Sequence, residues 1–396
     1  MTENKKLLMN TYARFPLTVV KGEGCYAVAD DGKRYLDFGS GIAVNALGYC
    51  HPAVTAAIRE QAATLCHCSN LYDSEPQYRL ASYLTKYSGL DRVFFCNSGA
   101  EANEGAIKLA RKYFFDQGKT EKYEIITMRK SFHGRTLATL TATGQDKVKT
   151  GFSPLPDGFV YAQYNDIETV KQALSSHTCA VMLEPIQGEG GVYPMTPTFA
   201  RELKDFCAAH DLLLIFDEIQ CGMARTGTVF AYEQYGIKPD IVTLAKALGG
   251  GLPLGAFIAA EKVAQSFGPG SHGSTFGANP VATAAGAAVF AELERRNLLP
   301  HIITMGELWK NELLVLQKEF PEIIVEIRGN GLMLGMEVKG GALPIVNRCL
   351  EQGLLILTAG PDTVRFLPPY IITAKEIEVA KKILKKALSA EIADLQ

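Results

Sequence analysis

The sequence has no large excess of charge of either sign. Its 40 basic and 42 acidic residues give a formal net charge of −2 over 396 residues. Nothing in this balance favours nucleic acid or an acidic membrane surface, so we expect neither partner. The sequence also lacks a run of about 18 uninterrupted apolar residues, and we expect no membrane-spanning helix. Residues 1–6 lack the apolar core of a signal peptide, which predicts a cytoplasmic protein.

A framework of paired cysteines is absent as well. The nine cysteines are odd in number and scattered from Cys25 to Cys349, as expected for reduced thiols in the cytosol. Cys66-His67-Cys68 has no second pair and fits no common zinc spacing. We therefore expect no metal site.

The composition is typical of a soluble globular protein, since 47% of the residues are hydrophobic and 21% are charged. Turn residues alternate with short apolar pieces over 17–39, which predicts a small antiparallel sheet. Helical spacing of apolar residues predicts helices over 53–66 and 73–87.

From residue 92 onward, short apolar strands are separated by helices. The predicted strands are 93–96, 124–128, 180–183, 212–216, 241–245 and 256–260, and the predicted helices are 100–115, 198–209 and 280–296. This alternation predicts a mostly parallel sheet with helices on both faces. Helices over 302–320 and 374–390, with strands over 323–328, 332–338, 354–357 and 364–367, predict a smaller α+β domain.

One lysine stands at the end of a predicted buried strand. Lys246 follows the apolar run 241–245 and precedes three glycines. A buried lysine amine is costly to desolvate without a partner, and desolvation lowers its pKa. Such an amine can attack a carbonyl carbon and form a Schiff base. A lysine that extends from a strand end into solvent is the alternative interpretation.

Other polar groups follow the neighbouring strands. Ser98 and Gly99 lie where a strand turns into a helix, a place where backbone N–H groups bind phosphate. Asp217 follows a buried strand and needs a cationic or hydrogen-bonding partner, such as a protonated pyridine nitrogen. Ligands of parallel sheets bind beyond these strand ends. A phosphate cradle, a reactive lysine and a carboxylate for a ring nitrogen are together what pyridoxal phosphate requires.

Six segments carry a resemblance to a known family. They are NSGAEANE (97–104), FHGRT (132–136), EPIQGEGG (184–191), DEIQCG (217–222), KALGGG (246–251) and GSTFG (273–277). In this order they resemble the class III, or ω-amino acid, pyridoxal-phosphate aminotransferases, and the similarity runs from about Tyr12 to Pro368. The sequence departs from the family at Ala278, where a glycine is usual, and at Tyr49, where a histidine is usual.

The resemblance implies the fold-type I architecture of this cofactor's enzymes, an α/β fold with a mostly parallel central sheet. We expect a large domain over 45–290 that binds the cofactor. The segment 1–44 should join a smaller α+β domain formed by 291–396.

The resemblance also implies roles for individual residues. Lys246 and Asp217 should be catalytic, Lys246 carrying the cofactor and Asp217 pairing with its ring nitrogen. The other expected cofactor contacts are Ser98, Gly99, Ala100, Phe132, Ile219, Gln220 and Thr275. Thr275 should reach the phosphate of a neighbouring subunit, which implies a homodimer with shared sites. Arg135, Glu189, Ser274 and Arg365 should contact substrate, with Glu189 acting as a gate for Arg365.

The implied reaction moves the δ-amino group of N2-acetylornithine to 2-oxoglutarate. Other ω-amino substrates, namely ornithine, succinylornithine and 4-aminobutyrate, stay open as alternatives. A non-catalytic binding protein on the same scaffold is disfavoured because it would not need Lys246, Asp217 and Arg135. A nicotinamide enzyme is disfavoured because no Gly-x-Gly-x-x-Gly follows an early strand.

Overall fold

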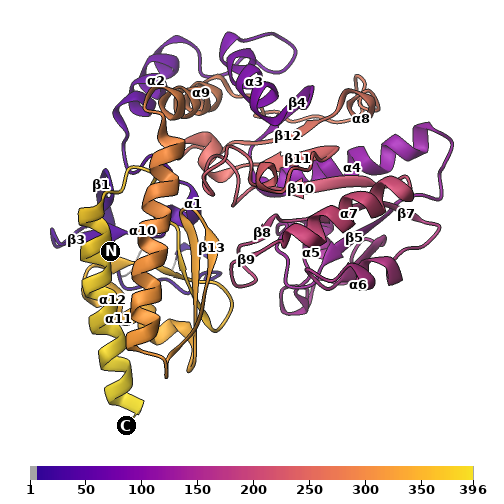
Figure 1. The fold of residues 1–396 in the computed structure, drawn as a ribbon. Coiled ribbons are helices and arrows are strands. Elements are labelled where there is room, and N and C mark those ends of the chain that lie inside the picture. Colours follow the sequence, from indigo (N-terminus) through magenta and orange to yellow (C-terminus); the bar gives the residue numbers. More distant parts are fainter. Residues whose placement is uncertain (1–6, 396) are drawn as a thin grey trace.

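The largest of the sheets has seven strands and lies on the right in Figure 1. The computed structural model describes residues 7–395 of the chain. The strand order is β4-β12-β11-β10-β7-β5-β6. In that order the strands span Arg92–Cys96, Gly255–Ala259, Ile241–Leu244, Leu213–Asp217, Thr178–Leu183, Glu124–Met128 and Phe159–Ala162. Only β12 runs against the others in this sheet, pairing antiparallel with both β11 and β4, so the predicted mostly parallel sheet is confirmed.

Both faces of this sheet are buried, which explains why its strands are apolar throughout. Helix α4 (Gly99–Asp116) crosses one face, where Ile107 and Phe114 pack with Ile215 of β10. Helices α3 (Glu75–Ser88) and α7 (Pro197–Ala209) cover the opposite face, where a separate cluster includes Leu84 and Phe216. Adjacent residues of one strand, such as those at 215 and 216, therefore enter different halves of the core.

The two ends of the chain meet in one sheet. Strands β1 (Val19–Glu23), β2 (Tyr26–Ala29) and β3 (Arg34–Asp37) form an antiparallel meander, as predicted. The short β15 (Leu354–Leu355) joins it parallel to β3. A second antiparallel sheet consists of β13 (Ile324–Asn330), β14 (Met333–Val338), β17 (Thr363–Phe366) and β16 (Leu357–Thr358). The domain boundaries stay a prediction, and residue 290 itself lies inside helix α9 (Pro280–Arg295).

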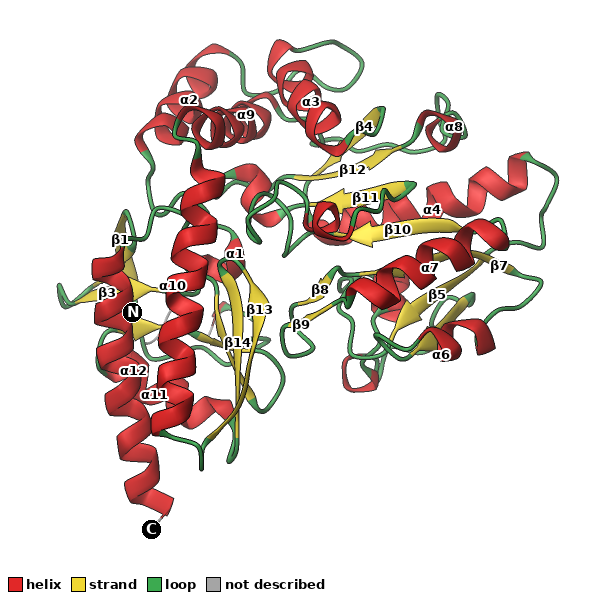
Figure 2. Cartoon of the chain, viewed as in Figure 1, coloured by secondary structure: helices red, strands yellow, loops and turns green. Residues whose placement is uncertain are grey.

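Long helices flank these smaller sheets (Figure 2). Helix α10 (Leu298–Glu319) packs on β13, while α12 (Ala374–Leu395) packs on α10 and α11 (Ala342–Glu351). Helix α2 (Pro52–Thr64) lies against α9, which also contacts α3. The remaining elements are α1 (Ser40–Ala43), α5 (Leu137–Ala142), α6 (Ile167–Gln172), α8 (Glu261–Ala264), the hairpin β8 (Ile186–Gln187) and β9 (Tyr193–Pro194), and the 3₁₀ turns η2 (Asp146–Val148), η3 (Ala231–Tyr235) and η4 (Lys246–Gly249).

Some elements differ from the sequence-based expectation. The prediction of one strand over 354–357 is wrong, because β15 and β16 pair with different sheets on either side of Ile356. Helix α10 begins at Leu298 rather than at 302, since Pro300 lies in the first turn, where its missing N–H group is not needed. Strand β6 and the helices α6 and α11 were not predicted. Pro344 near the start of α11 interrupts the helical signal there.

The short turn α1 has an unusual backbone. Ser40, Gly41, Ile42 and Ala43 all have positive φ angles, between 49° and 64°. Left-handed geometry costs about 1–2 kcal/mol for each residue that has a Cβ atom. The carboxylate of Asp37 supports the turn by accepting the backbone N–H groups of Gly39 and Ser40, both at 2.8 Å.

Over residues 7–395, no helix is long and apolar enough to cross a bilayer. The same part of the chain contains no group of three or more His, Cys, Asp or Glu residues arranged to hold a metal ion. All nine cysteines are unpaired, and six of them are buried.

Candidate active site

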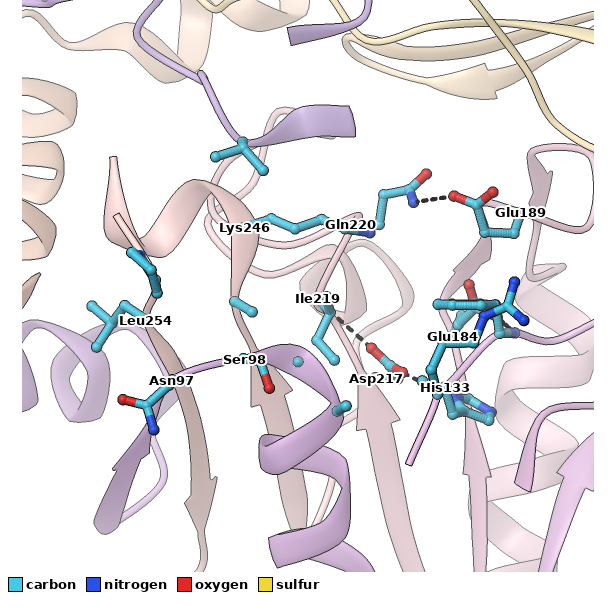
Figure 3. A pocket seen from close by; sticks show the side chains of 18 of the residues that line it. Asn97, Ser98, His133, Glu184, Glu189, Asp217, Ile219, Gln220, Lys246 and Leu254 are labelled. Carbon is cyan, nitrogen blue, oxygen red and sulfur yellow. Dashed lines mark hydrogen bonds and ion pairs between the residues drawn. The ribbon is translucent and has the colours of Figure 1, made fainter. Parts of the chain in front are cut away.

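A cavity of about 480 Å³ lies beyond the ends of β4, β10 and β11 (Figure 3). Strands that run in the same direction bring their carboxyl ends to one edge, so side chains distant in the sequence meet there. The predicted site residues that line it are Ser98, Gly99, Ala100, Phe132, Arg135, Glu189, Asp217, Ile219, Gln220 and Lys246.

The side chain of Lys246 extends into this cavity (Figure 3). Lys246 is the second residue after β11, which ends at Leu244. Its φ angle is 47°, in the left-handed region, and such strain in a residue with a Cβ atom is typical of functional sites. Burial lowers the pKa of the Lys246 amine. The carboxylate of Glu189 opposes this shift, and the guanidinium of Arg365 adds to it. The amine is therefore available in its neutral, nucleophilic form at a lower pH than an ordinary lysine.

Asp217 belongs to a group of four buried residues that are joined by hydrogen bonds, which we name the Asp217 cluster: Asn103, His133, Asp217 and Thr243. Oδ2 of Asp217 accepts hydrogen bonds from Asn103 Nδ2 at 2.7 Å and from His133 Nδ1 at 2.8 Å. Oδ1 accepts the backbone N–H of Ile219 at 3.1 Å. Asp217 is only 3% exposed, so these donors replace the water that would otherwise solvate its charge.

One acceptor position of Asp217 remains. Two carboxylate oxygens offer about four lone-pair sites, and the three donors above fill three of them. The fourth is on Oδ1, in a residue that lines the cavity. A ligand that carries one cationic N–H group fits this position.

Ser98 caps the helix that begins beside the cavity. Its hydroxyl oxygen accepts the backbone N–H of Glu101 at 3.2 Å, and Gly99 is the first residue of α4. A Cβ atom on Gly99 would lie 2.8 Å from Ile219 Cδ1, so a larger residue does not fit without movement. Unpaired backbone N–H groups at the start of this helix, together with its dipole, suit a phosphate group.

A second set of polar residues, which we name the Glu189 cluster, consists of Glu189, Gln220 and Arg365. Arg365 Nη1 lies 2.5 Å from Glu189 Oε1 and donates to Gln220 Oε1 at 2.9 Å. Gln220 Nε2 donates to Glu189 Oε1 at 3.0 Å (Figure 3). Burial by itself raises the pKa of Glu189. The charge and hydrogen bond of Arg365, with smaller effects of Lys246 and Gln220, together outweigh it, and the net shift is downward. Glu189 therefore stays ionised beside Arg365.

The remaining predicted residues differ in how they are placed relative to the cavity. Phe132 and Ile219 both line the cavity, and the guanidinium of the exposed Arg135 lies 5.7 Å from the centre of the Phe132 ring. Arg365 does not line the cavity but reaches two residues that do. Ser274 and Thr275 do not line it either. Ser274 accepts a hydrogen bond from Asn97, while Thr275 is exposed.

Sequence reasoning missed several residues around the cavity. No role was expected for Asn103 or Thr243, and Val44 and Leu254 add apolar walls. A signal existed for Asn103, because it is a polar residue among the small apolar residues on the inner side of α4. Val44 gave no such signal, since it reaches the cavity only through the left-handed turn before it.

A family model and curated relatives match the chain over nearly its whole length. The model described as aminotransferase class-III matches residues 8–388. An acetylornithine aminotransferase of Caldanaerobacter subterraneus is 51% identical over 390 residues, which cover 98% of this chain and 99% of that protein. An acetylornithine aminotransferase of Methanocaldococcus jannaschii is 48% identical over 374 residues, 94% of each chain.

Solved structures agree with this similarity. The N-acetylornithine aminotransferase of Stenotrophomonas maltophilia superposes with a TM-score of 0.84 at 39% identity, over 97% of this chain and 98% of that one. An ornithine aminotransferase of Toxoplasma gondii has a TM-score of 0.93 at 31% identity, over 98% of this chain and 93% of that one. The description of that structure notes partial occupancy of pyridoxal phosphate at its active site.

Proposed function

The chain belongs to the class III aminotransferases, and on that premise we propose that it transfers the δ-amino group of N2-acetylornithine to 2-oxoglutarate. The products are N-acetylglutamate 5-semialdehyde and glutamate. The observation that carries the proposal is the meeting of Lys246, Asp217 and the start of α4 around one cavity. Relatives named for this reaction share about half of their residues with the chain.

The residues present fit pyridoxal phosphate as the cofactor. The N-terminus of α4 at Ser98 and Gly99 would hold its phosphate, and the free acceptor position of Asp217 would receive its ring N–H. Gln220 and Ile219 line the same cavity and would contact the ring. When bound, the cofactor supplies an electron sink that stabilises negative charge on the substrate carbon that loses a proton.

Lys246 supplies the proton transfer. Its neutral amine would hold the cofactor in the resting enzyme and, once released, accept the proton from the substrate carbon that bears the amino group. The lowered pKa suits this role, since a base must be unprotonated at the working pH. Asp217 would keep the ring nitrogen protonated throughout, because an ionised carboxylate stabilises an adjacent cation.

Two arginines would bind the carboxylates of the two amino donors. Acetylornithine presents its δ-amine, with its carboxylate at the far end, whereas glutamate presents an α-amine with one carboxylate nearby. Arg135 would bind the distal carboxylate of both, and Arg365 would bind the α-carboxylate of glutamate alone. The contact between Glu189 and Arg365 supports the predicted gate, because Arg365 is only 2% exposed and needs a partner when acetylornithine is bound.

A comparison of amino donors tests the proposed substrate. Purified enzyme is assayed side by side on acetylornithine, succinylornithine, ornithine and 4-aminobutyrate, with 2-oxoglutarate as the acceptor. We expect the highest kcat/KM for acetylornithine, and a higher value for any other donor would contradict the assignment. Borohydride reduction followed by peptide mass mapping should find the cofactor on Lys246, and a label elsewhere would refute the role of this lysine.

We also propose that the enzyme acts in the cytoplasm as a homodimer with shared sites. The amide of Asn70 donates to the carbonyl oxygens of Ser274 and Gly277, so the loop at 65–74 lies on the loop that carries Thr275. Exposed apolar side chains gather on these two loops: Leu71 is 86% exposed, Tyr72 70% and Phe276 62%. Such a surface is typical of a protein interface, and a second copy that covers it would receive Thr275.

Mixed dimers test the sharing of sites. In a dimer of one Lys246→Ala chain and one Thr275→Ala chain, shared sites place both defects in one site and leave the other intact. We expect the mixed dimer to recover close to half of the wild-type activity. If mixing gives no more activity than the average of the two parent variants, each site lies within one chain.

A further inference from the structure

Asn103 is a fully buried amide whose nitrogen and oxygen both make hydrogen bonds. Its Nδ2 group donates to the carbonyl oxygen of His133 at 2.7 Å and to Asp217 Oδ2 at 2.7 Å. Its Oδ1 atom accepts the hydroxyl hydrogen of Thr243 at 2.8 Å. Asn103 and Thr243 are both 0% exposed. The amide therefore joins α4, the segment after β5, the end of β10 and the strand β11 that leads to Lys246.

The orientation of this amide is decided by its neighbours. A flipped amide would place its oxygen against two acceptors, the His133 carbonyl and the Asp217 carboxylate, and its NH₂ group would lose both. Only the orientation described satisfies all three partners. Thr243 reinforces it, because its hydroxyl donates to the amide oxygen from the opposite side.

Asn103 acts on the same oxygen of Asp217 as His133 does. Together they occupy Oδ2, and the backbone of Ile219 occupies one position of Oδ1. A carboxylate with one donor fewer on Oδ2 could turn about its Cβ–Cγ bond, and its free lone pair would no longer point in one fixed direction. Two donors on Oδ2 hold the group so that the free position stays on Oδ1.

We propose that Asn103 is a positioning residue that fixes the carboxylate of Asp217 for the ring nitrogen of the cofactor, with Thr243 fixing the amide in turn. The inference rests on the proposed function, since it assumes that Asp217 meets a ring nitrogen. It assigns a role in the chemistry to a helix residue that does not line the cavity. It also predicts that the protonation of the ring nitrogen depends on Asn103 and Thr243, two buried residues that would not touch the cofactor.

The test measures that protonation directly. Wild type and Asn103→Leu, a substitution of similar size without donors, are loaded with pyridoxal phosphate labelled with ¹⁵N in the ring. We expect the ¹⁵N resonance of wild type at the position of a protonated ring nitrogen and that of Asn103→Leu shifted toward the unprotonated position. Cofactor affinity, measured by equilibrium binding, should fall about tenfold, as expected for one lost hydrogen bond to a charged group.

Two further variants separate positioning from a general loss of packing. Thr243→Val keeps the donors of Asn103 but frees its amide, so we expect a smaller shift of the resonance and an affinity loss of about threefold. Thr127→Val is the matched control, because Thr127 is a buried threonine of the same sheet whose hydroxyl has no partner among the described residues. We expect it to leave the resonance and the affinity unchanged.

The outcomes distinguish the inference from its premise. If Asp217→Asn moves the ¹⁵N resonance but Asn103→Leu does not, Asn103 is a structural residue and the inference is wrong, whatever happens to activity or thermal stability. If Asp217→Asn leaves the resonance unchanged, the proposed contact between Asp217 and the ring nitrogen is itself wrong. A shift in Thr127→Val as large as that in Asn103→Leu would also overturn the inference, because any buried change would then produce it.

Discussion

The two polar clusters of the cavity are held together in different ways. In the Asp217 cluster, hydrogen bonds from buried side chains fix one carboxylate, and all four residues are at most 3% exposed. In the Glu189 cluster an ion pair joins Arg365, which is 2% exposed, to a glutamate whose side chain is 30% exposed. Glu189 also lies in a glycine-rich loop between β8 and β9, whereas Asp217 ends a central strand.

The difference fits the two tasks that we propose for these clusters, holding the cofactor and admitting two substrates. A cofactor that stays bound requires a carboxylate with a single geometry, and the buried donors of Asn103, His133 and Ile219 would hold Asp217 in one. Substrates with different carboxylates require an arginine whose partner can leave. An ion pair at the edge of a cavity can be replaced by a substrate carboxylate, because the incoming group makes the same charge-assisted contact. Charges of both clusters act on the pKa of Lys246: Glu189 and Asp217 raise it, and Arg365 lowers it.

The largest expected effect comes from replacing Lys246. Lys246→Ala should reduce both half-reactions by about 10⁴-fold or more, because it removes the amine that transfers the proton. Single-turnover absorbance changes with acetylornithine and with glutamate measure each half-reaction separately. A variant that keeps either half-reaction within tenfold of wild type would show that another group is the base.

Breaking the Asp217 cluster should affect both half-reactions equally. Asp217→Asn should retain the cofactor but lower both rates about a thousandfold, which corresponds to about 4 kcal/mol of transition-state stabilisation. The amide lacks the negative charge that keeps the ring nitrogen protonated. The same single-turnover spectra check this, and near-wild-type rates would refute the role of Asp217.

Breaking the Glu189 cluster should affect the half-reactions unequally. Glu189→Gln removes the charge that pairs with Arg365, so Arg365 stays free for the α-carboxylate of glutamate. We expect the glutamate half-reaction to be kept or improved and the acetylornithine half-reaction to fall about tenfold, the effect of losing one charge-assisted hydrogen bond. Equal losses in both would mean that Glu189 is structural or catalytic.

Arg135→Ala is the matched comparison for that experiment. Arg135 lines the cavity but belongs to neither cluster, and it is expected to bind the distal carboxylate of both substrates. Its loss should therefore slow both half-reactions, which is a symmetric pattern opposite to that of Glu189→Gln. A selective loss would instead assign Arg135 to a single substrate.

The smallest expected effect is on the titration of Lys246. Burial has the largest effect on the pKa of this amine and lowers it; Glu189 opposes that effect, and Arg365 adds to it. Glu189→Gln should therefore shift the pKa further down, and Arg365→Gln should shift it up. The pH dependence of the rate at which the cofactor-free protein binds pyridoxal phosphate reports this pKa, since only the neutral amine reacts. Shifts in the same direction for both variants would contradict the assignment.

Much of the large sheet could be predicted because its signal is local. Short apolar runs of four or five residues predicted β4, β5, β7, β10, β11 and β12 to within about two residues. The direction of β12 could not be predicted in the same way, since the run Ala256–Ala259 reads alike in a parallel or an antiparallel strand. The pairing of β15 with β3 was missed because β15 has only two residues, which give no periodicity.

The hydrogen bonds within the site were harder to predict than the residues that form it. Asp217 and Lys246 could be assigned from their positions at strand ends. The partners of Asp217 could not, because Asn103 lies 114 residues away in the chain. Gln220 was expected beside the cofactor ring, and its hydrogen bonds to Glu189 and Arg365 gave no sequence signal.

The sequence by itself therefore indicated which polar residues follow the strand ends and meet at the cavity, through local apolar patterns and the polar residues that end them. Family resemblance added the reaction class. Only the tertiary structure decided how these residues are held, because a hydrogen bond needs a donor and an acceptor within about 3 Å and correctly oriented. Glu189 and Arg365, which are 176 residues apart in the chain, meet this condition only through the packing of separate elements. The same packing places the amide of Asn103 beneath Asp217.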